Sequence, residues 1–257
     1  MAENSALNTT VGIPEHSQRL CGLLAIETSG SAGSVAWAEG TQVRKIIPLD
    51  PNRRTAATLT AALGELLAAA GESPRRIDVV AVANGPGSFT GLRIGVTAAK
   101  MLAYALQCPL VAVDTLAAMA GALWQADPQA EQAAVAINAY RQQVFTARWS
   151  RRQWEAAAED NTLAALSEVR LMAEWQQEIA ALDPTVTVAA DPAVVRALQR
   201  TAAPIAASKV AAVQQLWPDA GDVARLGLQL ARCGHFVSPW ELKPNYLRDS
   251  AAEEKLR

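Results

Sequence analysis

Short apolar runs and a longer helical pattern alternate over the first seventy residues. Three runs have the length of strands, and turn residues such as Glu39-Gly40 separate them. Residues 55–70 then place leucines at helical spacing and lead to Gly71, a residue type that often follows a helix. The pattern therefore predicts a three-stranded meander followed by a helix. The expected strands are 22–26, 34–38 and 43–49.

The rest of the chain continues this mixture of strands and helices. Further strands are expected at 77–83, 108–113, 134–138, 143–149 and 185–190. Further helices are expected at 89–106, 115–124, 171–182, 191–200 and 219–234. Tight turns join antiparallel strands and helices join parallel ones, so this order predicts an α/β fold with mixed sheets flanked by helices. No internal sequence repeat is visible.

The composition is that of a folded chain without a strong net charge. Of its 257 residues, 51% are hydrophobic and 19% charged, which excludes extensive disorder. The 23 basic and 25 acidic residues leave a net charge of −2, and the basic pairs are scattered along the chain. We therefore do not expect this chain to bind nucleic acid by itself.

Cysteine usage and the N-terminal residues bear on the compartment. The three cysteines lack the spacing of a zinc ribbon or a disulfide scaffold, which indicates a reducing environment. Residues 1–20 lack the apolar core of a signal peptide and are expected to form a flexible extension. No apolar run reaches the roughly 18 residues of a membrane span. These features predict a cytoplasmic protein that does not contact membranes.

The segment from Asn84 to Lys100 is the most specific feature of the sequence. A strand is followed by Gly85-Pro86-Gly87 and then by a helix whose first turn offers hydroxyl groups. Free N–H groups at such a helix start hold anions, although the glycine spacing matches neither a Walker A loop nor a dinucleotide motif. The alternative is a structural turn capped by its own side chains.

A second turn, Glu27-Thr28-Ser29-Gly30, follows the first expected strand. Its carboxylate is placed to hold magnesium or water near a phosphate, and the alternative is that Glu27 hydrogen-bonds its own turn. Together the two turns form a candidate nucleotide or anion site. The candidate residues are Glu27, Thr28, Ser29, Gly85, Gly87 and Ser88.

Two glycines lie four residues apart inside the helix that follows the Gly-Pro-Gly turn. Gly91 and Gly95 each cost about 1 kcal/mol of helix stability relative to alanine, so another backbone is expected to pack against them. That backbone belongs to another subunit or to a neighbouring part of this chain; we favour another subunit. The predicted interface residues are Leu59, Leu63, Gly91, Leu92, Gly95, Ala98, Ala99 and Leu102.

No catalytic or metal-binding group is visible in the sequence. The two histidines, His16 and His235, have no metal-ligand spacing between them. Ser29 and Ser88 lack the nucleophile elbow of hydrolases. We therefore predict neither catalytic residues nor a metal site in this chain.

Three segments in this order resemble the TsaB (YeaZ) family of tRNA threonylcarbamoyladenosine synthesis, which belongs to the M22 or glycoprotease-like superfamily. The segments are Leu23–Ser29 with Gly33–Ala36, Asn84–Gly95, and Pro244–Arg248. Two positions depart from the family pattern. Arg54 or Thr55 replaces a histidine, and Asn138 replaces a carboxylate.

The resemblance implies an actin-like ATPase fold with two ribonuclease-H-like lobes. The expected division is a first lobe at 21–118, completed by 219–248, and a second lobe at 119–218. It also implies a non-catalytic scaffold that dimerises with the paralogue TsaD through the helices at 55–70 and 89–106 and assembles with the ATPase TsaE. The complex transfers threonylcarbamoyl to N6 of adenosine 37 in tRNAs reading codons that begin with A.

Ligands and alternatives follow from the same resemblance. ATP or ADP with Mg²⁺ is expected in the complex rather than in the isolated chain, and tRNA is expected to bind only through the complex. A homodimer is a further possibility that the sequence leaves open. The alternative functions are a kinase or ATPase of the same fold, which uses Glu27 and the turn at 85–88, and a peptidase, which requires a metal.

Overall fold

The computed structural model describes residues 22–69, 77–200 and 213–248. The expected N-terminal extension at 1–20 lies outside the described residues. Within the described part, no helix combines the length and the apolarity that a membrane crossing requires.

The first lobe is built on a five-stranded sheet with the order β3-β2-β1-β4-β5. β1 pairs antiparallel with β2, and β2 with β3, whereas β1, β4 and β5 are parallel. The antiparallel part is the predicted meander. The strands are β1 (Gly22–Glu27), β2 (Ser34–Glu39), β3 (Gln42–Pro48), β4 (Val79–Gly85) and β5 (Leu110–Asp114).

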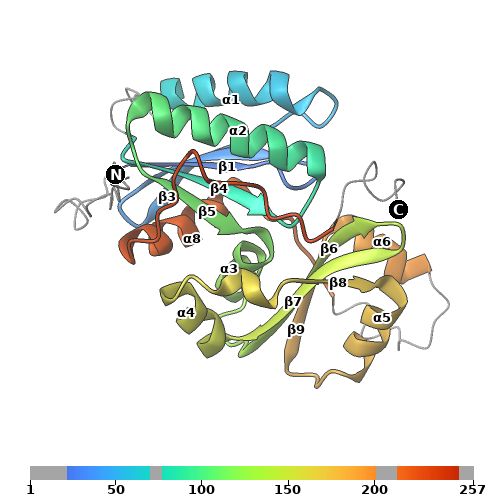
Figure 1. Ribbon diagram of the computed structural model, residues 1–257. Coiled ribbons are helices and arrows are strands. Elements are labelled where there is room, and N and C mark those ends of the chain that lie inside the picture. The colour runs from blue at the N-terminus through green and yellow to red at the C-terminus, as the bar shows by residue number, and fades with distance from the viewer. Residues whose placement is uncertain (1–21, 70–76, 201–212, 249–257) are drawn as a thin grey trace, which may run out of the picture.

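Helices cover both faces of this sheet. α1 (Thr55–Ala69) and α2 (Phe89–Leu106) lie side by side on one face, and α8 (Ala220–Arg232) lies on the other (Figure 1). Successive residues of β1 alternate between the two faces, as the strand period requires. Leu24 and Ile26 belong to the core under α1 and α2, and Leu23 and Ala25 to the core on the α8 side.

The second lobe repeats the strand order of the first. Its sheet runs β10-β9-β6-β7-β8, with the β6-β7-β8 part antiparallel and the β6-β9-β10 part parallel. This repeated order confirms the predicted actin-like fold of two lobes with mixed sheets. The strands are β6 (Gln132–Tyr140), β7 (Gln143–Ser150), β8 (Glu168–Leu171), β9 (Val186–Ala190) and β10 (Gln214–Gln215), and the accompanying helices are α4 (Arg151–Glu159), α5 (Met172–Ala181) and α6 (Pro192–Arg200), with the 3-10 turn η3 (Leu163–Leu166).

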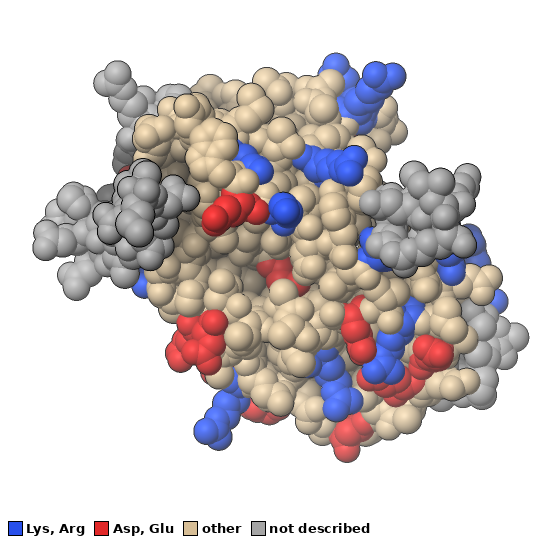
Figure 2. Space-filling view, in the orientation of Figure 1, with Lys and Arg blue, Asp and Glu red and all other residues tan. Residues whose placement is uncertain are grey.

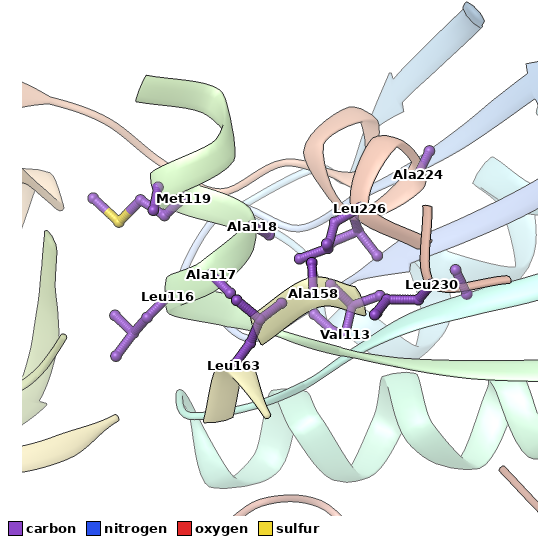
Figure 3. Close-up of a cluster of buried hydrophobic side chains, with 14 of the residues drawn as sticks. Val113, Leu116, Ala117, Ala118, Met119, Ala158, Leu163, Ala224, Leu226 and Leu230 are labelled. Carbon is purple, nitrogen blue, oxygen red and sulfur yellow. The ribbon is translucent and has the colours of Figure 1, made fainter. Parts of the chain in front are cut away.

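The helix α3 (Thr115–Ala126) joins the two lobes, and the expected boundary at 118/119 falls inside it. It packs against α8 and against β6 of the second sheet. Figure 3 shows Ala117 and Ala118 of α3 on the side that faces Leu226 of α8 and Ala158 of α4, whereas Leu116 and Met119 point to the opposite side of α3. Side chains from both sheets belong to this single buried cluster.

Four described elements were not predicted: α4, η3, β8 and β10. α4 was not predicted, because only Ala158 of its nine residues is buried and an apolar period is therefore weak. Its capping box is nevertheless complete: Ser150 caps the helix start, and Gln153 bonds back to Ser150. The short edge strand β8 ends at Leu171, where the predicted helix at 171–182 begins, and α5 itself starts one residue later, at Met172.

A C-terminal segment, 236–248, runs without regular structure from the first lobe to the second (Figure 1, red). The amide of Val237 donates to the carbonyl of Leu110 at 2.8 Å, and the amide of Asn245 donates to the carbonyl of Asn84 at 2.6 Å. Arg248 then donates to the carbonyl of Ala139 in the second lobe. The segment therefore ties the end of β4 to the tip of the β6–β7 hairpin.

Candidate functional site

Glu27 ends β1 with a fully buried carboxylate. Its Oε1 accepts a hydrogen bond from the amide of Ser29 at 2.6 Å and another from the Ser29 hydroxyl. Its Oε2 has no hydrogen-bond partner in the described part of the chain. The side chain therefore bonds its own turn, which is the structural alternative predicted for it, and leaves one buried oxygen unpaired.

Burial controls the charge of this group. Removal from water raises the pKa of Glu27 to about 7, because the charged form loses its hydration, and Asp219 adds to the rise. The hydrogen bonds from Ser29 and the amide of Gly30 act in the opposite direction. Glu27 is therefore partly protonated near neutral pH, unlike an ordinary ligand of magnesium, which is ionised.

The structure brings the Gly-Pro-Gly turn against the Glu27 turn, as predicted. The amide of Ser88 donates to the carbonyl of Ser29 at 2.7 Å, and Ser88 Oγ caps α2 by accepting from the amide of Gly91 at 3.3 Å. A Cβ on Gly87 would lie 2.6 Å from Ser29 Cβ. The helix start is thus capped by its own serine.

The C-terminal segment packs against Gly85, the first residue of the same turn. The φ of Gly85 is +121°, and a Cβ at this position would lie 2.5 Å from the carbonyl oxygen of Asn245. The close approach that glycine permits is therefore used by the C-terminal segment of this chain. Nucleotide or anion binding by the two turns remains a prediction.

The predicted role of the helix glycines is wrong. A Cβ on Gly91 would overlap the carbonyl oxygen of Thr28, and one on Gly95 would overlap Thr28 Oγ1. The Thr28 hydroxyl donates to the carbonyl of Gly91 at 2.8 Å. Thr28, which directly follows β1 in the same chain, packs its backbone against Gly91 and its side chain against Gly95, and a neighbouring part of this chain was the alternative left open.

Other predicted interface residues share this burial. Leu59, Leu92 and Ala99 are buried in the core between the first sheet and its two helices, so they offer nothing to a partner. Leu63, Ala98 and Leu102 are half-buried and pack against the same core. The predicted helices are correct, but the predicted contact face is their inner one.

The outer face of α1 and α2 was missed by the sequence analysis. On α1 it consists of Ala57, Ala61, Gly64 and Ala68, and on α2 of Met101 and Tyr104. Met101 is 66% and Tyr104 57% exposed, and Gly64 has no neighbour within 4 Å of a Cβ position. The Tyr104 ring meets exposed Trp240 edge-on, with centroids 5.2 Å apart. The sequence does contain a signal for this face, because small residues recur at helical spacing on the side of the helix opposite to the buried leucines.

A hollow between the lobes contains another carboxyl group that the sequence analysis missed. The cavity has a volume of about 570 Å³, and Asp114, Lys243 and Glu241 line it. Figure 2 shows the hollow at the centre of this face, with an acidic side chain on its floor. Burial raises the pKa of Asp114 to about 6. Its Oδ1 caps α3 by accepting from the amide of Ala117, and its Oδ2 accepts from the Ser167 hydroxyl. Asp114 therefore has a structural partner for each oxygen.

The described residues also show whether side chains could hold a metal ion together. Within residues 22–69, 77–200 and 213–248, no three His, Cys, Asp or Glu side chains gather closely enough to hold a metal ion.

Comparison with known proteins identifies the family. The family model described as TsaD, tRNA N6-adenosine threonylcarbamoyltransferase, matches residues 38–256. The tRNA threonylcarbamoyladenosine biosynthesis protein TsaB of Escherichia coli K12 is 30% identical over 235 residues, which are 91% of this chain and 97% of that protein. The chain belongs to the TsaB family. TsaB of Haemophilus influenzae is 34% identical over 126 residues, 48% of this chain and 51% of that protein.

Solved structures agree with this membership. A Pseudomonas aeruginosa protein described as similar to peptidase YeaZ superposes with a TM-score of 0.67 at 26% identity, covering 89% of this chain and 100% of that one. YeaZ from the same organism gives a TM-score of 0.66 at 26% identity, with 88% and 100% covered.

The three segments that resemble the TsaB family meet in the structure. Thr28, at the end of the first segment, packs on Gly91 and Gly95 of the second. Asn245 of the third segment covers Gly85 of the second. The family motifs therefore form one contiguous structural unit at the end of the first sheet.

Proposed function

We propose that this chain is a non-catalytic subunit of the assembly that transfers threonylcarbamoyl to N6 of adenosine 37 in tRNAs reading codons that begin with A. In this proposal it binds the catalytic paralogue TsaD and recruits the ATPase TsaE, in the cytoplasm. The observation that carries the proposal is the similarity to TsaB of E. coli over 91% of the chain. ATP or ADP with Mg²⁺ then belongs to the complex rather than to this chain alone.

The outer face of α1 and α2 is the docking surface in this proposal. Its α1 residues are small, so a partner helix can approach closely at Gly64. On α2, Met101 and Tyr104 expose large apolar side chains, which favour burial against a partner. The same surface is available to a second copy of this chain, so a homodimer is the state that TsaD displaces.

Substitutions on the outer face test the proposal by calorimetry of the full-length chain with TsaD. Gly64→Arg fills open space on α1, and Met101→Glu adds a charge to the apolar part of α2. Each is expected to weaken binding by at least about tenfold, because a bulky or charged group must be buried without a partner. Gln177→Glu adds the same charge at an exposed position of α5 and is the matched control. Its affinity for TsaD is expected to be unchanged. Unchanged binding of both outer-face variants would refute docking through this surface.

A further inference from the structure

A cavity of about 220 Å³ lies where the two lobes and the C-terminal segment meet. The start of α2 contributes Phe89, the β6–β7 hairpin contributes Tyr140 and Arg141, and the C-terminal segment contributes Tyr246 and Arg248. The cavity is separate from the outer face of α1 and α2. Neither the nucleotide hypothesis nor the docking proposal uses its aromatic and basic walls.

Aromatic rings form one wall of this cavity. Phe89 and Tyr246 are stacked with ring centroids 4.6 Å apart and an angle of 28° between their planes. The guanidinium of Arg93 lies 4.1 Å from the centroid of Phe89, and its Nε donates to the Tyr246 hydroxyl at 3.1 Å. The wall is therefore held in place before any ligand enters. Tyr140, on the hairpin side, is 61% exposed.

The charge around the cavity is positive. Arg141 and Arg248 line it, Arg93 stands beside it, and none of its lining residues is acidic. Helix α2 carries Arg93 and Lys100 and no carboxylate along its whole length. In Figure 2, basic side chains lie over both lobes, whereas the acidic ones lie mainly over the second lobe. The net charge of −2 conceals this local distribution.

The hairpin tip holds its side chains in a costly backbone conformation. Tyr140, Arg141 and Gln142 have φ values of 61°, 48° and 61°, so three successive non-glycine residues are left-handed. Two hydrogen bonds support the tip: Asn138 Oδ1 accepts from the amide of Tyr140 at 2.9 Å, and the carbonyl of Gln142 accepts from the amide of Met172 at 2.7 Å. Such conformations concentrate at binding and catalytic sites.

We propose that this cavity binds one unpaired base of single-stranded RNA, with the surrounding arginines contacting the adjoining phosphates. Its volume is below the roughly 300–1,000 Å³ of ordinary small-molecule pockets, so it suits one ring rather than a whole nucleoside triphosphate. Unpaired RNA bases stack on aromatic side chains and arginine planes. Guanidinium groups match phosphate oxygens in geometry and charge. This inference goes beyond the proposed function, because it assigns an RNA contact to this chain itself.

Fluorescence anisotropy with the full-length chain and a labelled single-stranded RNA heptamer tests the inference. Tyr140→Leu removes a stacking surface and is expected to weaken binding by about fivefold or more. Arg141→Ala is expected to make the negative slope of log K against log salt less steep by about 0.7, the value for one lost phosphate contact on a single strand. Arg152→Ala, an equal charge change on exposed α4, is the matched control and should alter neither quantity.

If the wild type binds RNA, three outcomes would still overturn the inference. The first is equal affinity of the wild type, Tyr140→Leu and Arg141→Ala, with circular dichroism showing that both variants are folded. The second is binding of a duplex of the same sequence as tightly as the single strand. The third is competition by free AMP as effective as competition by unlabelled heptamer, which would indicate a site for a free nucleotide.

The result is separable from the test of the proposed function. Tyr140→Leu is expected to keep its affinity for TsaD, and Gly64→Arg is expected to keep its affinity for RNA. Loss of TsaD binding with intact RNA binding would leave this inference standing. Absence of RNA binding by the wild type would overturn it and leave the docking proposal untouched.

Discussion

Glu27 shows how burial changes what a single residue does. The sequence places a carboxylate at a strand end, where it suggests a magnesium ligand. In the folded chain its Oε1 is bonded to Ser29 and its Oε2 is buried without a partner. Because burial raises the pKa of Glu27 to about 7, the neutral form is favoured up to neutral pH. The residue acts on stability in a way that depends on pH.

This dependence gives a prediction at the scale of the residue. The pKa of Glu27 is about 7 in the folded chain against 4.5 for the free group, so the folded state holds a proton that the unfolded state has released. This retained proton contributes roughly 3 kcal/mol to the free energy of unfolding. The contribution is complete below pH 4.5 and is lost as the pH rises through 7. Urea denaturation from pH 5 to 8 should show a smaller loss of stability for Glu27→Gln than for the wild type.

The buried carboxyl groups of Asp114 and Asp222 have raised pKa values of about 6 and about 7. Part of the decrease in the free energy of unfolding with rising pH therefore remains in Glu27→Gln. Glu65→Gln, which removes an exposed carboxylate, is the control and should retain the wild-type slope. Parallel curves for the wild type and Glu27→Gln would contradict the assignment.

Helices α1 and α2 carry glycines for opposite structural reasons. Gly91 and Gly95 of α2 face Thr28 at the end of β1, and side chains there would collide with buried atoms. Gly64 of α1 faces open space. At the scale of the helix, one set of glycines serves the internal packing of the lobe and the other lies on the outer face.

The same substitution in the two helices distinguishes these roles. Gly91→Ala should lower the free energy of unfolding by about 3 kcal/mol or more, because its Cβ meets the backbone of Thr28. Gly64→Ala should raise it by up to about 1 kcal/mol, because alanine favours a helix and meets no neighbour. Chemical denaturation of the full chain measures both, and a tolerated Gly91→Ala would show that β1 and α2 can separate at little cost.

The two lobes of the whole molecule share one large hydrophobic cluster. It contains Leu23 and Val79 of the first sheet, Val135 and Trp149 of the second, and residues of α3 such as Leu123. The C-terminal segment adds polar links between the lobes. A core that crosses the boundary couples the unfolding of the parts on either side.

We therefore expect the lobes to unfold together. Leu123→Ala leaves a cavity in the shared core and should destabilise the amides of β1 and β6 equally, by about 2–5 kcal/mol in native-state hydrogen exchange. Leu166→Ala, at an exposed position of η3, should change neither strand. A loss confined to β6 would show that the lobes are separate cooperative units.

Periodicity and turn residues were sufficient for most elements of the fold. The meander, the helices at 55–69 and 89–106, and the hairpin near Tyr140 follow from local patterns, since strand and helix periods are properties of neighbouring residues. The edge strand β8 and helix α4 were missed because few of their residues are buried, so their apolar periods are weak. The repeated strand order of the two lobes has no sequence repeat to reveal it.

What the sequence determined by itself is the family and the type of each long element, because motifs and periods are local. The tertiary structure alone decided which surface each residue meets. Two glycines four apart indicate a close neighbour, and only the fold shows that this neighbour is Thr28 of the same chain rather than a partner. Likewise, Phe89, Tyr140 and Tyr246 come from three distant segments, and chain folding alone brings them to one cavity.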